Sequence, residues 1–301
     1  MDAGRRAHYG DFYAAAPGDR GPVALVHGNC QAESLRVVLA GSPGLPMRTV
    51  RMPPVHELEA TDLPHLHALL TRCELLVSQP VRPDYRDLPL GTAQLAELLP
   101  RSARVVRVPV VRYLGLHPWS AIVRHPSDPA LAPPLVAYHD LRTLTAAAGR
   151  PAPTAPPTPE VLHEVGAASV AELARREQAF CDVGVSDLLE GFGVGAAHTI
   201  NPPGNDVVVA LARRVQQALG LPADAADPGR TLLGEVRAPL EQAVVDARGF
   251  DVAARPHWSV RGEPVRDDDV RRTQLDWYRS HPGWVAAGLE RHAERIDRLG
   301  L

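Results

Sequence analysis

Short apolar runs alternate with helix-like segments from Val23 onward, and this alternation constrains the fold more than any other feature of the chain. Runs of the length of buried strands occupy residues 23–27, 47–52, 74–78 and 104–108. Segments with a helical spacing of apolar residues lie between them, at 31–40, 63–70 and 91–99. Strands that alternate with helices predict an α/β fold whose mainly parallel sheet is flanked by helices.

The rest of the chain completes the expected organisation. We expect a flexible N-terminus over residues 1–21, an α/β catalytic domain over 22–220 and a mostly helical C-terminal extension over 221–301. A proline-rich stretch at 150–159 predicts a stiff, extended connection within the catalytic domain. Further helices are predicted at 159–166, 169–190, 206–219 and, interrupted near Pro282, 267–298.

Composition narrows the class of protein. The 301 residues carry a formal net charge of −3 and no strongly basic segment, so we expect no nucleic acid partner. Three cysteines are too few and too scattered for a disulfide framework, which is typical of a reducing compartment. The N-terminal residues lack the apolar core of a secretory signal, and no apolar stretch has the length of a membrane span. These features predict a cytoplasmic location.

Cys30 is the sharpest candidate for chemistry, because it opens a predicted helix directly after the first predicted strand. Free N–H groups and the helix dipole at such a position favour a thiolate, so we expect a lowered pKa. Gly28 permits a tight turn there, and the amides of Asn29 and Gln31 could donate to a bound ligand or a developing oxyanion. A small buried cysteine without a chemical role is the alternative.

Two histidines are candidate partners of the cysteine. His117 follows the fourth predicted strand, and His139 stands beside Asp140, which could orient an imidazole. Either histidine could act as a general base or as the imidazolium partner of Cys30. Each could equally be a structural residue.

Arginines and aromatic residues in the loops after the strands could bind a ligand, since ligands of parallel sheets bind beyond the carboxyl ends of the strands. Arg82 and Arg112 are the main candidates for holding phosphate groups in a bidentate manner, and Arg107 and Arg124 are nearby in the sequence. Trp119 and Tyr85 could stack on a flat ring or line a sugar site. Ordinary surface arginines and partly buried aromatic residues are the alternative.

Several classes of site are disfavoured. His65, His67 and Cys73 match no common zinc spacing, and we expect no metal. The turn after the first predicted strand, GNCQAES, has one glycine, where a nicotinamide-binding turn needs several. A Walker loop and a G-x-S-x-G serine motif are both missing from the sequence.

Taken in order, six segments of the chain resemble the WcbI-type polysaccharide biosynthesis proteins, a family assigned as capsule acetyltransferases that bind coenzyme A. The segments are HGNCQAESL, SQPVRPDY, PVVRYLGLHPW, AYHDLR, ARREQAFCDVGVSDLL and HTINPPGNDVVVALARRV. The resemblance implies a coenzyme A site in the crevice, with Cys30 as the motif cysteine and His117 in the Gly-x-His-Pro-like segment. The chain departs from the family at Asn201-Pro202-Pro203, where Asn-His-Pro is expected, so His198 would have to substitute for that histidine if it is required.

The resulting hypothesis is an acyl (acetyl) transferase that uses coenzyme A as acetyl-coenzyme A and acts on a saccharide hydroxyl in polysaccharide biosynthesis. Cys30 would either take the acyl group or lie beside the thioester, while His117 would move the proton of the acceptor hydroxyl. One alternative is an esterase or thioesterase related in layout to SGNH-type hydrolases and using Cys30. Another is a non-catalytic protein that binds a sugar or nucleotide.

Overall fold

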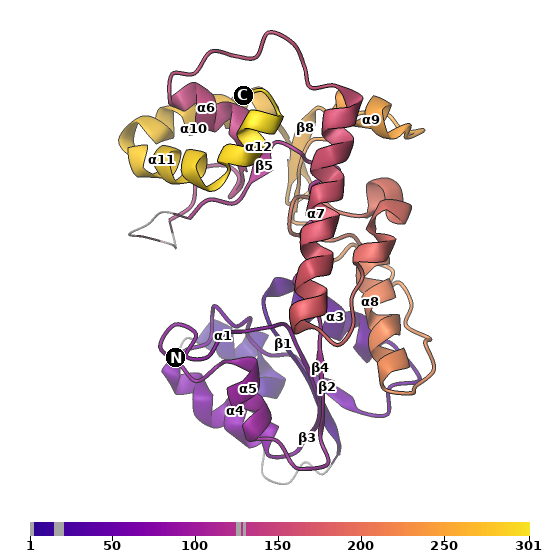
Figure 1. The fold of residues 1–301 in the computed structure, drawn as a ribbon. Helices are drawn as coiled ribbons and strands as arrows, with labels where there is room; N and C mark the ends of the chain where they lie inside the picture. The colour runs from indigo at the N-terminus through magenta and orange to yellow at the C-terminus, as the bar shows by residue number, and fades with distance from the viewer. Residues whose placement is uncertain (1–2, 15–20, 125–127, 129–130) are drawn as a thin grey trace. The chain divides into compact units, whose positions relative to one another are not determined.

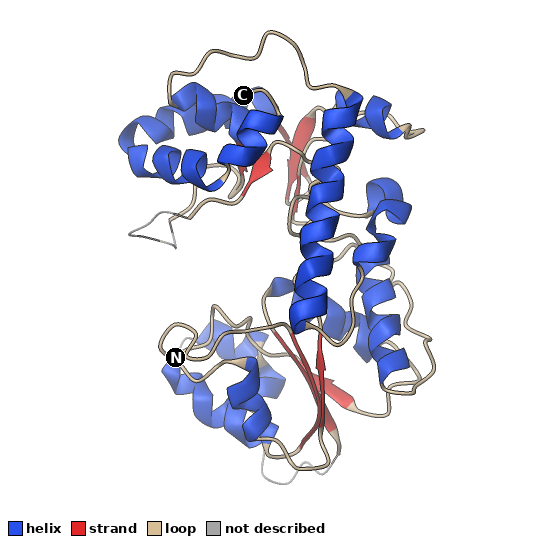
Figure 2. Cartoon of the chain, viewed as in Figure 1, coloured by secondary structure: helices blue, strands red, loops and turns tan. Residues whose placement is uncertain are grey.

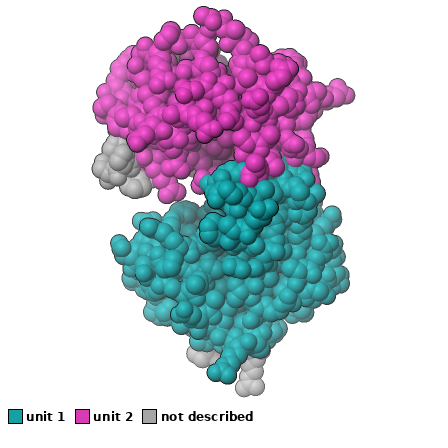
Figure 3. All heavy atoms as spheres, in the orientation of Figure 1, with its two compact units in different colours: residues 1–111, 172–189, 204–233 teal, residues 112–171, 190–203, 234–301 magenta. Residues whose placement is uncertain are grey.

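The computed structural model describes residues 3–14, 21–124, 128 and 131–301, which divide into two compact units (Figure 3). Unit 1 comprises residues 1–111, 172–189 and 204–233. Unit 2 comprises residues 112–171, 190–203 and 234–301. The predicted boundary between catalytic domain and C-terminal extension, at 220/221, falls within unit 1 and stays a prediction.

Unit 1 contains a four-stranded sheet whose strands are all parallel (Figures 1 and 2). The spatial order of its strands is β2 (Arg48–Val50), β1 (Val23–His27), β3 (Cys73–Ser78) and β4 (Arg104–Arg107). All five residues of β1 are buried, as expected of a central parallel strand that is covered on both faces. The predicted α/β fold with a mainly parallel sheet is therefore confirmed.

Helices cover this sheet and supply its core. They are α3 (Cys30–Ala40), α4 (Leu63–Leu70), α5 (Thr92–Glu97) and α8 (Asn205–Ala218), with a 3₁₀ turn at Ala60–Asp62. Leu35 on α3 and Leu69 on α4 are almost completely buried, and α3 also packs against α8. The apolar residues that recur with helical spacing in the sequence thus face the core, as expected of amphipathic helices.

The N-terminus differs from the flexible segment predicted over residues 1–21. Short helices occupy Ala3–His8 (α1) and Gly10–Tyr13 (α2), while residues 1–2 and 15–20 lie outside the described part of the chain. Phe12 is fully buried in the core of unit 1, and Arg5 forms a 2.7 Å ion pair with Asp62. These long-range contacts order helices that are too short to be stable alone.

Unit 2 combines short antiparallel strands with helices. One two-stranded ladder pairs β5 (Ser120–Ala121) with β6 (His139–Asp140), and a three-stranded sheet has the order β7 (Val236–Arg237), β8 (His257–Val260) and β9 (Glu263–Arg266). Its helices are α6 (Leu141–Ala147), α9 (Gln242–Arg248), α10 (Asp267–Ser280), α11 (Pro282–Arg291) and α12 (Ala293–Arg298).

Residues 221–301 therefore contain the expected helices together with a sheet that the sequence did not predict. Arg261 and Gly262 both have positive φ angles between β8 and β9, as a two-residue hairpin turn requires. The strands are two to four residues long. Such strands are too short to produce a clear alternating pattern of apolar residues, which is why the sequence did not reveal them.

Helix α7 (Pro159–Phe180) is one continuous helix, although the sequence predicts an interruption after Gly166 and an end near residue 190. A Cβ atom at Gly166 would lie 1.8 Å from Arg248 Nη2 and 3.2 Å from the Cα atom of Gly115, so this glycine allows close packing rather than ending a helix. Beyond Phe180 the chain forms a 3₁₀ segment at Ser186–Gly195 instead of continuing the α-helix. Within the described ranges, no helix combines the length and apolar character needed to cross a membrane.

Candidate functional site

The turn between β1 and α3 places Cys30 in the first turn of the helix, as predicted. Asn29 caps the helix, since its Oδ1 accepts a 2.9 Å hydrogen bond from the backbone N–H of Gln31. The backbone N–H of Asn29 donates to Gln79 Oε1 over 2.8 Å. The turn is therefore held both by its own cap and by a side chain that follows β3.

Gly28 is required at this turn by close approach. A Cβ atom on Gly28 would lie 2.3 Å from Gln79 Oε1. Gln79 is buried and its backbone N–H donates to the carbonyl oxygen of His27 over 2.8 Å, so the side chain has little freedom to withdraw. The glycine in the GNCQ motif is therefore explained by the position of Gln79 and needs no direct contact with a ligand.

The protonation state of Cys30 differs from the expectation. Its side chain is exposed, and the backbone N–H groups of Cys30 and Gln31 stabilise the thiolate as predicted. Loss of hydration among the surrounding protein atoms is nevertheless the largest effect, and the negative charge of Glu57 adds to it, so the pKa of the thiol is raised. The expectation of a lowered pKa is therefore wrong for the free protein, in which Cys30 is a neutral thiol at pH 7.

Alkylation of Cys30 by iodoacetamide should accordingly be slow at neutral pH. The thiolate is the reacting species, so the rate should rise with pH and reach half its maximum above the ~8.5 of a free cysteine. Mass spectrometry of peptides would follow Cys30 separately from the buried Cys73 and the half-buried Cys181. Glutathione in the same buffers is the reference, and a midpoint below that of glutathione would contradict the prediction.

Gln31 has a structural position that the sequence did not anticipate. Its Nε2 donates to the carbonyl oxygen of Val111, and its Oε1 accepts from the backbone N–H of the same residue, each over 2.9 Å. The side chain is buried and joins the first turn of α3 to the segment after β4. One N–H of the amide is therefore committed to this link, and a role of Gln31 as a donor to a ligand stays a prediction.

A pocket of about 420 Å³ opens in unit 1 beyond the carboxyl ends of β3 and β4. Apolar side chains and three arginines surround it. The lining residues are Pro80, Val81, Arg82, Pro109, Val110, Leu173, Arg175, Arg176, Phe180 and Cys181. Its position agrees with the rule for ligand sites of parallel sheets.

The arginines of this pocket are not equivalent. Arg175 and Arg176 both bind Glu172, through bonds of 2.8 Å and 2.7 Å. Arg82, which the sequence predicted as a cofactor-binding residue, is exposed and makes no ion pair with any residue that the structure describes. The Arg82 guanidinium is therefore available to an anionic ligand.

Gln79 connects this pocket with the cysteine turn. Its Oε1 accepts from Asn29 next to Cys30, while its Nε2 donates over 3.5 Å to the carbonyl oxygen of Pro109, which lines the pocket. Pro80, the next residue, lines the same pocket. The ends of β1, β3 and β4 are thus fixed together on one edge of the sheet.

His117 lies in unit 2 and is buried. Its Nδ1 donates to the carbonyl oxygen of Pro239 over 3.1 Å, while Nε2 has no hydrogen-bond partner among the described residues. Burial lowers the pKa of the ring to about 4, with the nearby charge of Arg255 acting in the same direction. The ring is therefore neutral at pH 7, and its Nε2 is closed off from solvent.

His139, the second predicted catalytic histidine, is enclosed by aromatic side chains of unit 2. Its ring stacks on Tyr278 at a centroid distance of 5.8 Å and contacts Trp284 at 4.8 Å. Its Nδ1 is hydrogen-bonded to the Tyr278 hydroxyl, and burial lowers the pKa of the ring to about 4. This environment favours a role in side-chain packing.

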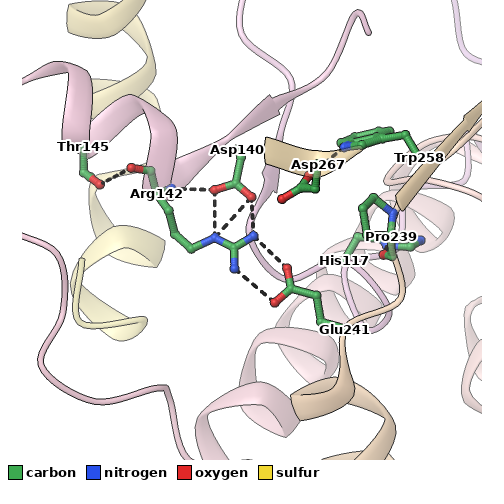
Figure 4. A network of polar contacts seen from close by, with 8 residues as sticks. All are labelled: His117, Asp140, Arg142, Thr145, Pro239, Glu241, Trp258 and Asp267. Atoms are coloured by element: carbon green, nitrogen blue, oxygen red, sulfur yellow. Dashed lines mark hydrogen bonds and ion pairs between the residues drawn. The ribbon is translucent and has the colours of Figure 1, made fainter. Parts of the chain in front are cut away.

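A network of charged residues lies beside His117 in unit 2 (Figure 4). The Arg142 guanidinium lies between the carboxylates of Asp140 and Glu241, with distances of 2.6 Å and 2.7 Å. It also lies 4.4 Å above the ring of Trp119. These residues line a small cavity together with Trp258 and Asp267. Among these residues, the sequence pattern singled out only Asp140 and Trp119, and Glu241, Trp258 and Asp267 come from segments far along the chain.

The remaining candidates occupy varied positions. Arg107 forms a 2.7 Å ion pair with Asp182, so its charge is already matched. Arg112, a predicted cofactor-binding residue, is half-buried in unit 2, and Arg124 is exposed there. Cys30 belongs to unit 1, whereas His117 belongs to unit 2, so their pairing stays a prediction.

Comparison with known proteins decides the family. The family model described as "Polysaccharide biosynthesis enzyme WcbI" matches residues 23–224. This chain belongs to the WcbI family. The family consists of polysaccharide biosynthesis enzymes, and the match confirms the resemblance predicted from the sequence.

A solved structure supports the same fold for this WcbI-family chain. The structure of WcbI, described as a novel polysaccharide biosynthesis enzyme, has a TM-score of 0.78 and 20% sequence identity, and the match covers 93% of this chain and 97% of that chain. That structure is described as native protein without a disulfide bond between coenzyme A and one of its cysteines. None of the curated proteins matches the chain.

The departure from the family motif at residues 201–203 has a defined structural setting. Asn201 accepts a 2.8 Å hydrogen bond from the Tyr138 hydroxyl, and the backbone N–H of His198 donates to the carbonyl oxygen of Pro202. His198 lies near enough to His117 for its charge to lower the pKa of that ring. In this WcbI-family chain, His198 therefore lies in the surroundings of His117, and whether it replaces the missing motif histidine stays a prediction.

Proposed function

We propose that this chain is a coenzyme A-dependent acyltransferase that transfers an acyl group, such as acetyl, to a saccharide hydroxyl. The observation that carries the proposal is an exposed cysteine in the first turn of α3, coupled through Gln79 to a pocket of about 420 Å³. Arg82 in this pocket has no ion-pair partner among the described residues. The reference to coenzyme A and a cysteine in the description of the WcbI structure supports the choice of ligand.

The chemistry of the unit 1 pocket fits coenzyme A. The molecule combines anionic phosphates with a long, mostly apolar arm and a flat ring. Arg82 would hold a phosphate group, because guanidinium groups bind phosphate oxygens in a bidentate manner. Phe180, Leu173 and Val81 would contact the apolar parts, as in most small-molecule pockets.

Cys30 would meet the sulfur end of coenzyme A. Since the pKa of its thiol is raised, Cys30 is protonated at neutral pH and is better suited to lie beside the thioester than to carry the acyl group as a resting thiolate. Acetyl-coenzyme A supplies the acyl group as a thioester. The acceptor hydroxyl would attack the thioester carbonyl, and coenzyme A would leave and take up the hydroxyl proton as its free thiol. His117, whose ring is neutral at pH 7, stays the predicted base for that proton.

Substitution of Arg82 by alanine should weaken binding of coenzyme A at least about tenfold, because it removes one charge-assisted contact worth ~1.5–3 kcal/mol. A thermal-shift titration of the full chain with coenzyme A, acetyl-coenzyme A and NAD measures this. At a hundredfold excess over Kd, a ligand adds ~2.7 kcal/mol to the apparent free energy of unfolding. We expect both coenzyme A forms to shift the transition and NAD to leave it unchanged.

Arg101→Ala is the matched control, since Arg101 is exposed in the same unit and does not line the pocket. An unchanged affinity in Arg82→Ala, or a shift with NAD alone, would contradict the proposed site. Release of free thiol from acetyl-coenzyme A should depend on added saccharide. Fast, saturable release without saccharide would instead indicate a hydrolase.

A further inference from the structure

The loop that follows β2 is hydrogen-bonded to the cysteine turn of unit 1. The backbone N–H of Val55 in this loop donates to the carbonyl oxygen of Gly28 over 2.7 Å, and Gly28 lies two residues before Cys30. Val55 is buried in the core of the unit, which anchors the loop. Since β1 and β2 are parallel neighbours, the segments after them meet at the edge of the sheet where ligands bind.

The loop that follows β3 contacts the same segment. Arg86 Nη1 donates to the carbonyl oxygen of His56, the residue after Val55. Arg86 belongs to the stretch that starts with Pro80 and Arg82, both of which line the pocket of about 420 Å³. The segment after β2 is therefore bonded both to the cysteine turn and to the loop that borders the proposed coenzyme A site.

Glu57, the next residue of this segment, has one carboxylate oxygen engaged and the other open. Its Oε2 accepts a 3.1 Å hydrogen bond from the hydroxyl of Tyr9, and burial raises the pKa of that hydroxyl to about 12, so Tyr9 is a donor at neutral pH. The backbone of Glu57 is fixed as well, since its carbonyl oxygen accepts from Arg5 Nη2 over 2.7 Å. Within the described part of the chain no group donates to Oε1, and His56 Nε2 lies 3.9 Å away, beyond hydrogen-bond distance.

The charge of Glu57 acts on the thiol of Cys30. Loss of hydration is the largest effect that raises the pKa of Cys30, and the carboxylate of Glu57 raises it further. Because salt and water screen charges that are separated by more than ~10 Å, this effect requires the carboxylate to lie near the sulfur. The Glu57 side chain is 43% exposed, so a ligand beside Cys30 can reach it.

The base of an acyl transfer has to come within hydrogen-bond distance of the acceptor hydroxyl. His117, the base predicted from the sequence, belongs to unit 2, and its Nε2 is closed off from solvent. Glu57 belongs to the unit that carries Cys30, and its Oε1 is open. Accessibility therefore favours the carboxylate.

We propose that Glu57 is a catalytic residue of the Cys30 site and takes the proton of the acceptor hydroxyl at Oε1. The inference rests on the proposed function and assigns its proton transfer to Glu57 in place of His117. The hydroxyl oxygen bonds to the carbonyl carbon of the thioester while its proton moves to the carboxylate. The carbon–sulfur bond then breaks, and the departing sulfur takes that proton back from Glu57. The products are the acylated acceptor and coenzyme A as a free thiol.

Glu57→Gln tests this step, because glutamine keeps the size of the side chain and an oxygen for the bond from Tyr9 but cannot take up a proton. The full chain receives acetyl-coenzyme A with methyl glucoside as the acceptor, or with water alone, and release of free thiol is followed. We expect release at saturating acetyl-coenzyme A to fall at least about 100-fold, since a general base contributes ~10²–10⁴ to the rate. The thermal shift by coenzyme A should stay at its wild-type size.

Glu97→Gln is the matched control, because Glu97 is exposed in the same unit and is not among the groups that change the pKa of Cys30. Alkylation of Cys30 by iodoacetamide gives a second measurement, which needs no acceptor. Its midpoint should move to lower pH in Glu57→Gln, because the charge that disfavours the thiolate is removed. The midpoint should stay at the wild-type value in Glu97→Gln.

Equal release of thiol by the two variants would overturn the inference. An unchanged alkylation midpoint in Glu57→Gln would also overturn it, since Glu57 would then lie away from Cys30. So would a loss of rate that is accompanied by loss of the thermal shift, because Glu57 would then act in binding or folding. Failure of the proposed function would appear in the wild-type chain, as no shift by coenzyme A or no release of thiol above the uncatalysed rate.

Discussion

Replacement of Gln31 by leucine should lower the free energy of unfolding of unit 1 by about 3 kcal/mol. Leucine has a similar size but leaves the N–H and C=O groups of Val111 without their partners. An unsatisfied buried backbone group costs ~1–3 kcal/mol, and two are created here. Urea unfolding followed by circular dichroism measures the change as a lower transition midpoint.

Gln217→Leu provides the comparison for this prediction. Gln217 is an exposed residue of α8 in the same unit, so its replacement should change the free energy of unfolding by less than ~0.5 kcal/mol. A stable Gln31→Leu protein that binds coenzyme A but has lost acyl transfer would instead assign Gln31 to the stabilisation of an oxyanion. The two roles therefore predict different measurements.

Replacement of Arg142 by methionine should cost about 2–3 kcal/mol of unit 2 stability. Asp140 and Glu241 would lose their shared partner and face each other as carboxylates, and the contact of the guanidinium with Trp119 would be lost. Their side chains are 24% and 32% exposed, so water offsets part of the 3–5 kcal/mol expected for a fully buried pair. Thermal unfolding at neutral pH measures the loss.

Arg279→Met is the control for the arginine substitution. Arg279 pairs with Asp276 on the surface of α10, where the two side chains are 78% and 63% exposed. Such pairs contribute ~0–1 kcal/mol, so this variant should unfold at nearly the wild-type temperature. Equal losses in the two arginine variants would mean that the network of Figure 4 contributes no more than a surface ion pair.

The local sequence was sufficient to predict the parallel sheet and the position of Cys30. An apolar run, a glycine and a helix-capping asparagine in immediate succession specify a strand, a turn and a helix start, and each of these depends on neighbouring residues only. The helices of unit 1 followed in the same way from the spacing of their apolar residues. The interruption predicted after Gly166 was wrong because the reason for that glycine is Arg248, which is distant in the sequence.

The chemical state of the candidate residues depended on contacts that no local pattern contains. The pKa of Cys30 is raised because surrounding protein atoms remove water from the sulfur, an effect larger than that of the helix start visible in the sequence. The Gln31 side chain forms two hydrogen bonds with the backbone of Val111. Glu241, Trp258 and Asp267 line one cavity together with His117.

The sequence by itself determined the α/β architecture, the family and the placement of a cysteine at the start of α3, because hydrophobic periodicity and helix capping act over a few residues. Only the tertiary structure decided which polar groups are satisfied, which are left open and which way each pKa moves. Those properties depend on burial and on charges brought together from distant parts of the chain.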